Sequence, residues 1–204
     1  MAVSHIELLV EEASMEAALR ALLPRLLGEL SFQVYPYQGK LDLLKRLPDR
    51  LRGYAAWLPS DHRIVVVVDR DDDDCRELKQ RLEQMAADAG LQTRSQAGGP
   101  TYQVVNRLAI EELEAWYFGD WDAVRAAYPR VSRLIPNQAN YRDPDAIKGG
   151  TWEAFERVLQ RAGYFETGLR KIEAARAVAT HLQPESNRSR SFCVFRDVLK
   201  EMIA

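Results

Sequence analysis

Residues 64–74 read IVVVVDRDDDD, a run of β-branched residues that ends in acids. Such a run has no alternation of polar and apolar positions, so it predicts a strand that helices cover on both faces. The acids that follow favour the start of a helix, since Asp is stabilised near a helix N-terminus. We therefore expect the central strand of an α/β fold at 64–68, followed by a helix that Asp72 to Asp74 cap.

Strand and helix patterns alternate on both sides of this stretch. Apolar runs rich in β-compatible residues lie at 5–10, 32–37 and 102–109, with a weaker one at 92–96. Apolar residues at helical spacing lie at 14–28, 39–57 and 71–89. This order predicts an α/β fold with a mostly parallel sheet flanked by helices and joined by right-handed crossovers.

The last third of the chain carries helical patterns only. They lie at 151–162, 168–181 and 189–203. We expect a single domain over residues 1–204, in which a core at about 5–118 carries the sheet and about 119–204 form a C-terminal helical extension.

The composition excludes several classes of protein. A net charge of −2 and a pI near 6.0 leave no overall positive charge for nucleic-acid binding, so a polyanion would need a local basic patch. Cys75 and Cys193 lack the spacing of a disulfide framework or a thiolate zinc site. The N-terminal residues lack a signal-peptide pattern, and no apolar stretch reaches the ~18 residues of a membrane span, so we expect a cytoplasmic protein.

Acidic residues follow two of the predicted strands. Glu11 and Glu12 come directly after the strand at 5–10, and Asp69 and Asp71 come after the strand at 64–68. Ligands of an open parallel sheet bind at the carboxyl ends of the strands, so these acids are expected to converge there. Crowded carboxylates repel each other unless a cation compensates them, and oxygen ligands of this kind suit Mg²⁺ or Mn²⁺. In extended backbone, Asp69 and Asp71 would point to the same side and reach one ion.

Other acids allow a second interpretation. Glu12 and Glu16 also fit the positive end of the first helix, although Glu16 is a candidate for a second metal site. Glu111 and Glu114 are three residues apart on a helix expected to begin near 110, where such a pair is usually solvated. Glu114 is nevertheless a candidate active-site carboxylate, because its neighbours are apolar and aromatic.

The order of these acids resembles the Toprim domain of topoisomerases, primases and overcoming-lysogenization-defect nucleases. In that family a Glu follows the first strand and an Asp-x-Asp pair follows the third, matched here by Glu11, Asp69 and Asp71. The usual Glu-Gly of the first motif is Glu11-Glu12 here, which leaves open which Glu is the ligand.

The chain is more closely similar to a bacterial family of small Toprim-like proteins. Members carry a Glu-x-Trp element, matched by residues 114–116, and a Ser-x-Ser-Phe element, matched by 189–192. The resemblance implies Mg²⁺-dependent cleavage of phosphodiester bonds in DNA or RNA, often beside an ATPase of the ABC or AAA type. It would give Asp69 and Asp71 the role of metal ligands and Glu11 that of ligand or general base, with Glu16 and Glu114 at a second ion.

A nuclease also needs cations for the substrate backbone. Arg188, Arg190 and Lys148 are the candidates for phosphate binding, because guanidinium groups bind phosphate in a bidentate manner. The alternative is an ordinary solvated surface, since basic residues alternate with acids in this part of the chain.

Two rival functions remain open. The first is a noncatalytic metal-binding module that regulates or partners an ATPase. The second is a phosphoacceptor or phosphatase site with Asp69 as nucleophile, which needs a lysine at the end of a later strand where the sequence offers only Arg107.

Overall fold

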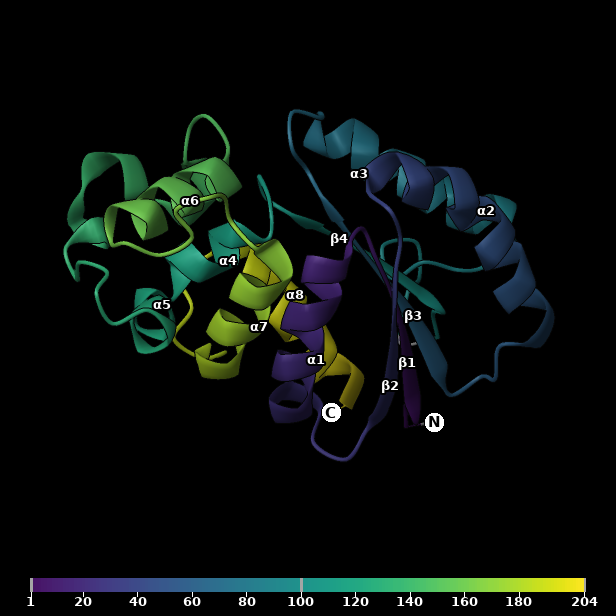
Figure 1. Cartoon of the computed structure of the whole chain (residues 1–204). Coiled ribbons are helices and arrows are strands. Elements are labelled where there is room, and N and C mark those ends of the chain that lie inside the picture. The colour runs from purple at the N-terminus through teal and green to yellow at the C-terminus, as the bar shows by residue number, and fades with distance from the viewer. Residues whose placement is uncertain (1, 100, 204) are drawn as a thin grey trace.

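The computed structural model describes residues 2–99 and 101–203 and contains one four-stranded sheet (Figure 1). All neighbouring strands are parallel and their order is β2-β1-β3-β4. The predicted α/β class with a parallel sheet is therefore confirmed. The strands are β1 (His5–Val10), β2 (Ser31–Pro36), β3 (His62–Asp69) and β4 (Val104–Ala109).

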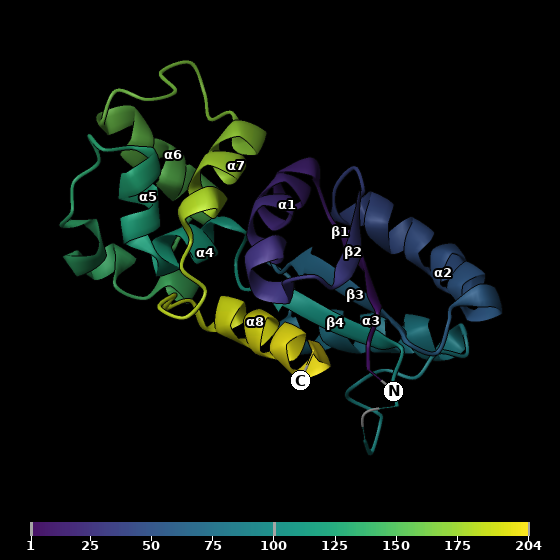
Figure 2. The same cartoon turned by 90° about the horizontal axis from the view of Figure 1, so that it is seen from below.

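Helices cover both faces of the sheet (Figures 1 and 2). The alternating residues of β3 explain this, because Val65 and Val67 join one buried apolar cluster whereas Val66 and Val68 join the other. The strand is buried on both faces, as its unbroken apolar run predicted. The crossover helices are α1 (Ala13–Leu27), α2 (Lys40–Trp57) and α3 (Cys75–Asp88), of which α2 and α3 lie together on one face.

The C-terminal helices pack on the face that α1 covers (Figure 2). The apolar cluster of that face includes Val65 of the sheet, Leu19 of α1 and Val178 near the C-terminus of the chain. The predicted helical extension is thus present and shares apolar packing with the sheet. Its helices are α5 (Trp121–Ala127), α6 (Thr151–Arg161), α7 (Lys171–His181) and α8 (Arg190–Ile203), with short 3₁₀ turns η1 (Ile135–Asn137), η2 (Ala139–Tyr141) and η3 (Pro144–Ala146). The short helix α4 (Glu114–Gly119) lies at the end of the predicted core.

The Glu-x-Trp element at 114–116 and the Ser-x-Ser-Phe element at 189–192 contact each other. The indole Nε1 of Trp116 donates a hydrogen bond to Oγ of Ser191 at 3.2 Å, and its ring lies 5.2 Å from that of Phe192. Asn187 donates from Nδ2 to the carbonyl of Trp116 at 2.8 Å. A Cβ on Gly119 would lie 2.1 Å from Oδ1 of Asn187, so only glycine fits this approach. These contacts hold α4 against the start of α8.

Some local predictions differ from the structure. The helix expected near residue 110 begins at Glu114, because Glu111 has a positive φ of 58° that interrupts helical backbone. The strand expected at 92–96 is reduced to one bridge between Thr93 and Val104. Within the described residues, no helix combines the length and the apolar character needed to cross a bilayer.

Candidate active site at the carboxyl ends of the strands

The adjacency of β1 and β3 brings Glu11 and Asp69 to the same edge of the sheet. Val10 is in register with Val67, so Glu11, the next residue, comes level with Val68 and beside Asp69. Oε2 of Glu11 accepts a hydrogen bond from the backbone N–H of Asp69 at 3.1 Å. The predicted convergence of these two acids is confirmed.

Asp69 is the most constrained of the acids. It is 5% exposed, and its Oδ1 is buried without a hydrogen-bond partner. Burial raises the pKa of the Asp69 carboxyl well above its ordinary value, and the charges of Glu11 and Glu114 raise it further. An ionised carboxylate in this position is costly unless a cation compensates it.

Glu11 and Glu114 share this environment. Burial raises the pKa of Glu11 to about 7, against the hydrogen bond from the Asp69 N–H, which lowers it. Glu114 is 3% exposed, and burial raises its pKa to about 8 although the charge of Lys171 opposes the shift. Three buried carboxyl groups with raised pKa values are therefore gathered at one edge of the sheet.

Tyr117 adds a phenol to this cluster. It lies one helical turn after Glu114 on α4 and is 1% exposed, and its hydroxyl has no hydrogen-bond partner. Burial raises its pKa, as do the charges of Glu114 and Asp69. The aromatic run 116–118 suggested a core position, which is correct, but it gave no sign that one ring would face the acids.

The backbone and the contacts of Asp71 differ from those expected from the sequence. The strand ends at Asp69, and Asp71 has a left-handed φ of 48°, so the rule for extended backbone does not apply to this pair. Its carboxylate forms an ion pair with Nζ of Lys40 at 2.7 Å. Its charge still raises the pKa values of Glu11 and Asp69, so it lies within electrostatic reach of both.

Lys40, the first residue of α2, is a site residue that was not predicted from the sequence. Its Nζ contacts Asp71, Asp73 at 2.8 Å and the carbonyl of Arg70 at 2.9 Å, and so ties the loop after β3 to α2. A signal was present, because Lys40 follows β2 at the same edge where the acids follow β1 and β3.

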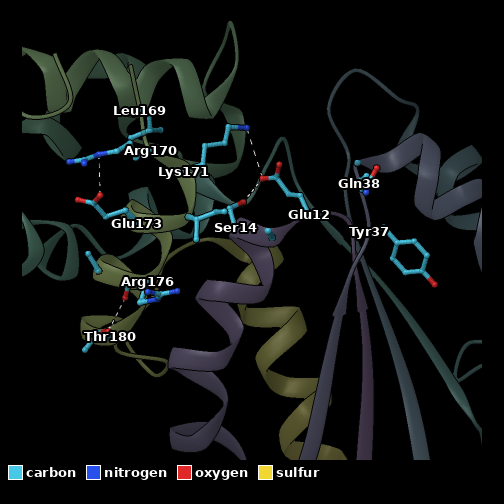
Figure 3. A pocket seen from close by; sticks show the side chains of 14 residues that line it. Glu12, Ser14, Tyr37, Gln38, Leu169, Arg170, Lys171, Glu173, Arg176 and Thr180 are labelled. Atoms are coloured by element: carbon cyan, nitrogen blue, oxygen red, sulfur yellow. Dashed lines mark hydrogen bonds and ion pairs between the residues drawn. The ribbon is translucent and has the colours of Figure 1, made fainter. Parts of the chain in front are cut away.

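Lys171 at the start of α7 also lies beside the acids (Figure 3). Its Nζ lies 4.0 Å from the carboxylate of Glu12 and 4.9 Å from the ring centre of Trp152. Burial lowers its pKa, but the charges of Glu114 and Glu12 outweigh this and raise the pKa overall. Lys171 therefore stays cationic beside the acids.

A groove of about 1090 Å³ opens beside Glu12, between α1, α7 and the loop that joins β2 to α2 (Figure 3). Glu12 and Glu173 are the acids in its lining, whereas Glu11, Asp69 and Glu114 do not line it. Its basic side chains all come from residues at the start and middle of α7, namely Arg170, Lys171 and Arg176.

Two further acids, the candidate Glu16 and the neighbouring Glu111, form ion pairs with arginines. Glu16 forms an ion pair with Arg20 at 2.7 Å on α1, and Glu111 forms one with Arg70. Glu12, the alternative to Glu11, is half-buried and lies toward the groove. The cluster thus favours Glu11 over Glu12 as the inner carboxylate, and the role of Glu16 at a second ion stays a prediction.

The three cations expected to bind phosphate are not gathered in one patch. The guanidinium of Arg188 donates to the carbonyl of Arg142 at 2.9 Å. Arg190 and Lys148 line different cavities, of about 470 and 320 Å³.

The donor chemistry of the cluster fits a divalent cation. In the described ranges, no three His, Cys, Asp or Glu side chains stand ready to bind one ion. The inner groups are nevertheless all oxygen donors, and Oδ1 of Asp69 is buried without a partner. Hard cations such as Mg²⁺ and Mn²⁺ prefer such oxygens, so Asp69 and Glu114 are the residues that would hold the ion, with Glu11 beside them as ligand or base.

Comparison with known proteins gives one match. The model of the family described as a domain of unknown function (DUF4276) matches residues 10–202. No curated protein and no solved structure matches the chain.

Proposed function

The chain belongs to the DUF4276 family, and we propose that it is a Mg²⁺- or Mn²⁺-dependent nuclease. The observation that carries this proposal is the burial of Glu11, Asp69 and Glu114 together at the carboxyl edge of a parallel sheet. The reaction is hydrolysis of phosphodiester bonds in DNA or RNA. The order of the acids along the chain, which resembles the Toprim domain, supports the same conclusion.

The electrostatics of the cluster support a cation-dependent reaction. Burial raises the pKa values of all three acids, and the charges of neighbouring acids raise them further, so the cluster carries its full negative charge near neutral pH only at a cost. A structural role alone does not require carboxyl groups here, since apolar side chains would pack without that cost.

Each residue of the cluster has a role in such a reaction. A bound divalent cation supplies a Lewis acid and lowers the pKa of a coordinated water. Asp69 and Glu114 would hold the ion, and Glu11, with its pKa of about 7, is suited to accept a proton from the attacking water. Lys171 would face the charge that develops on the phosphoryl oxygens. Lys40 would position the loop that carries Asp71.

The groove beside Glu12 is the proposed approach for the scissile phosphate. It is open to solvent, and Arg176 on α7 adds a positive charge to that of Lys171, whereas Arg170 forms an ion pair with Glu173 at 3.1 Å. Basic side chains that follow a groove guide a nucleic-acid backbone irrespective of sequence. A partner ATPase is part of the proposal through the resemblance to small Toprim-like proteins.

Cleavage assays with supercoiled plasmid, single-stranded DNA and RNA test this function. We expect cleavage with Mg²⁺ or Mn²⁺, none with EDTA, and a loss of at least about 100-fold in Asp69→Asn. Glu166→Gln, which changes an exposed acid between α6 and α7, is the matched control and should cleave like the wild type. Cleavage by Asp69→Asn at the wild-type rate would overturn the proposal.

A noncatalytic metal-binding module for an ATPase is the second candidate. The observation in its favour is that Lys40 and Lys171 already contact Asp71 and Glu12. Calorimetry separates the two functions. Saturable Mn²⁺ binding that Asp69→Asn abolishes, without cleavage of any of the three substrates, would favour the module.

A further inference from the structure

A second cavity, of about 470 Å³, is lined by residues of α3, β4 and α8. Figure 2 shows these three elements, with β4 at the edge of the sheet. β4 is the last strand of the sheet, and among the described residues only Thr93 bridges to its outer side, at Val104. The edge beyond Val104 therefore faces this cavity. The lining residues that matter most are Arg76, Asn106, Arg107, Ile110, Arg190 and Val194.

The cavity carries an excess of positive charge. Arg76, Arg107 and Arg190 line it, and none of the three forms an ion pair within the part of the chain that the structure describes. Asp145 is the acid in the lining, and its carboxylate accepts hydrogen bonds from the hydroxyls of Ser189 at 2.8 Å and Ser191 at 3.0 Å. Three unpaired guanidinium groups around one cavity favour an anionic ligand.

Two buried polar atoms at the cavity lack partners. Asn106 is 1% exposed, and its Oδ1 has no hydrogen bond although its Nδ2 donates to Glu83 at 3.0 Å. Nε of Arg107 is also buried without a partner, and burial lowers the pKa of this guanidinium. Buried polar groups are nearly always hydrogen-bonded, so Asn106 and Arg107, which both line the cavity, each retain a hydrogen-bonding group that a ligand or a water can complete.

The rest of the lining is apolar. Leu108 and Ile110 come from the end of β4, and Val194 comes from α8 with 44% of its surface exposed. Aliphatic side chains beside guanidinium groups suit a ligand with a flat apolar part and a nearby negative charge. A nucleotide has this form, with its base against the aliphatic surface and its phosphate at the arginines.

An open strand edge also suits an extended peptide, but the contacts here oppose that ligand. The carbonyl of Asn106, which a peptide strand would need, already accepts from Nζ of Lys79 at 2.8 Å and from Arg107 at 3.2 Å. Charged side chains that occupy an edge in this way prevent strand addition.

We propose that the cavity between α3, β4 and α8 binds one nucleotide of a single-stranded nucleic acid. The position of the cavity agrees with this ligand, because Ile110 directly follows Ala109, which is in register with Asp69. A strand could then extend from the acids to this cavity along one edge of the sheet. The inference rests on the proposed function only in taking nucleic acid as the substrate.

Fluorescence anisotropy with a labelled oligothymidylate of about 12 nucleotides tests the site. The titration is done in EDTA, so it does not depend on a metal or on cleavage. We expect the double variant Arg76→Gln/Arg190→Gln, which changes two exposed side chains, to bind about tenfold or more weakly and with a smaller dependence on salt. Arg81→Gln, an exposed position on the same helix outside the cavity, is the control and should bind like the wild type. Equal affinity of the double variant and the wild type would overturn the proposal.

A second pair of variants tests the charge of the ligand at matched side-chain size. Val194→Glu should weaken oligothymidylate binding several-fold relative to Val194→Gln, because only the former adds a negative charge to a cavity that holds an anion. An acidic peptide that binds the wild type and not the double variant, with oligothymidylate binding unchanged, would identify a protein ligand and refute the assignment. Thymidine monophosphate that competes as well as the whole oligonucleotide would refute a strand as the ligand.

The two assays can refute the nuclease proposal and the cavity proposal separately. Loss of binding in the cavity variants without any cleavage by the wild type would refute the nuclease alone. Cleavage that needs Asp69, together with unchanged binding in the cavity variants, would refute the cavity alone.

Discussion

Replacement of Glu11 by glutamine should stabilise the metal-free protein at alkaline pH. Burial raises the pKa of this carboxyl from 4.5 to about 7. Between these two values the folded chain binds more protons than the unfolded chain, so the free energy of unfolding falls as the pH rises through that window. The amide oxygen that Glu11→Gln introduces can still accept the hydrogen bond from the Asp69 N–H.

The size of the effect follows from the same values. At about 1.4 kcal/mol per pH unit, ionised Glu11 costs the folded state about 3 kcal/mol at about pH 8.5. For a chain of this length that corresponds to a Tm higher by about 6–12 °C in Glu11→Gln. The effect should disappear at about pH 4, where the carboxyl is protonated in both states.

Differential scanning calorimetry in EDTA at both pH values measures this change. Glu166→Gln removes an exposed acid and should shift the Tm by less than about 1 °C. If Glu11→Gln were no more stable than the wild type at the higher pH, the acid would not be under electrostatic strain, and the argument for a cation would fail with it.

Three further outcomes are expected. Added Mg²⁺ or Mn²⁺ should raise the Tm of the wild type at about pH 8 but not that of Asp69→Asn, as thermal shift in a metal titration would measure. Cleavage should fall at acid pH as the Glu11 carboxylate is protonated and lost as a base, and a flat pH profile of single-turnover rates would exclude this role. Trp116→Ala should lower the free energy of unfolding by about 3–5 kcal/mol in urea, whereas Trp57→Ala, at a position 57% exposed, should cost much less.

Much of the architecture follows from local patterns. The unbroken apolar run of β3 requires cover on both faces, and the structure provides it. Asp74 caps α3, accepting hydrogen bonds from the N–H groups of Arg76 and Glu77, which is the role that its place in the acidic run predicted. The meeting of Glu11 and Asp69 was predictable because parallel strands deliver their carboxyl ends to one edge.

The remaining parts of the site depend on contacts between distant segments. Lys171 reaches the acids because α7 packs against α1, and no pattern within residues 168–181 indicates this. The basic residues Arg76, Arg107 and Arg190 come from three separate elements, so their charge looked dispersed in the sequence. The prediction that Asp69 and Asp71 point to the same side also fails. It assumed extended backbone, and the left-handed φ of Asp71 ends the strand geometry.

The packing of Trp116 on α8 determines the smallest piece of the chain that can retain the acids. Glu114 lies on the same short helix as Trp116, and that helix rests on Ser191, Phe192 and Phe195. A fragment that stops at residue 118 would include Glu11, Asp69 and Glu114 but would lack the surface that keeps Glu114 in place. Studies of this site therefore need the chain through the last helix, and tags or fusions are better attached at the other end.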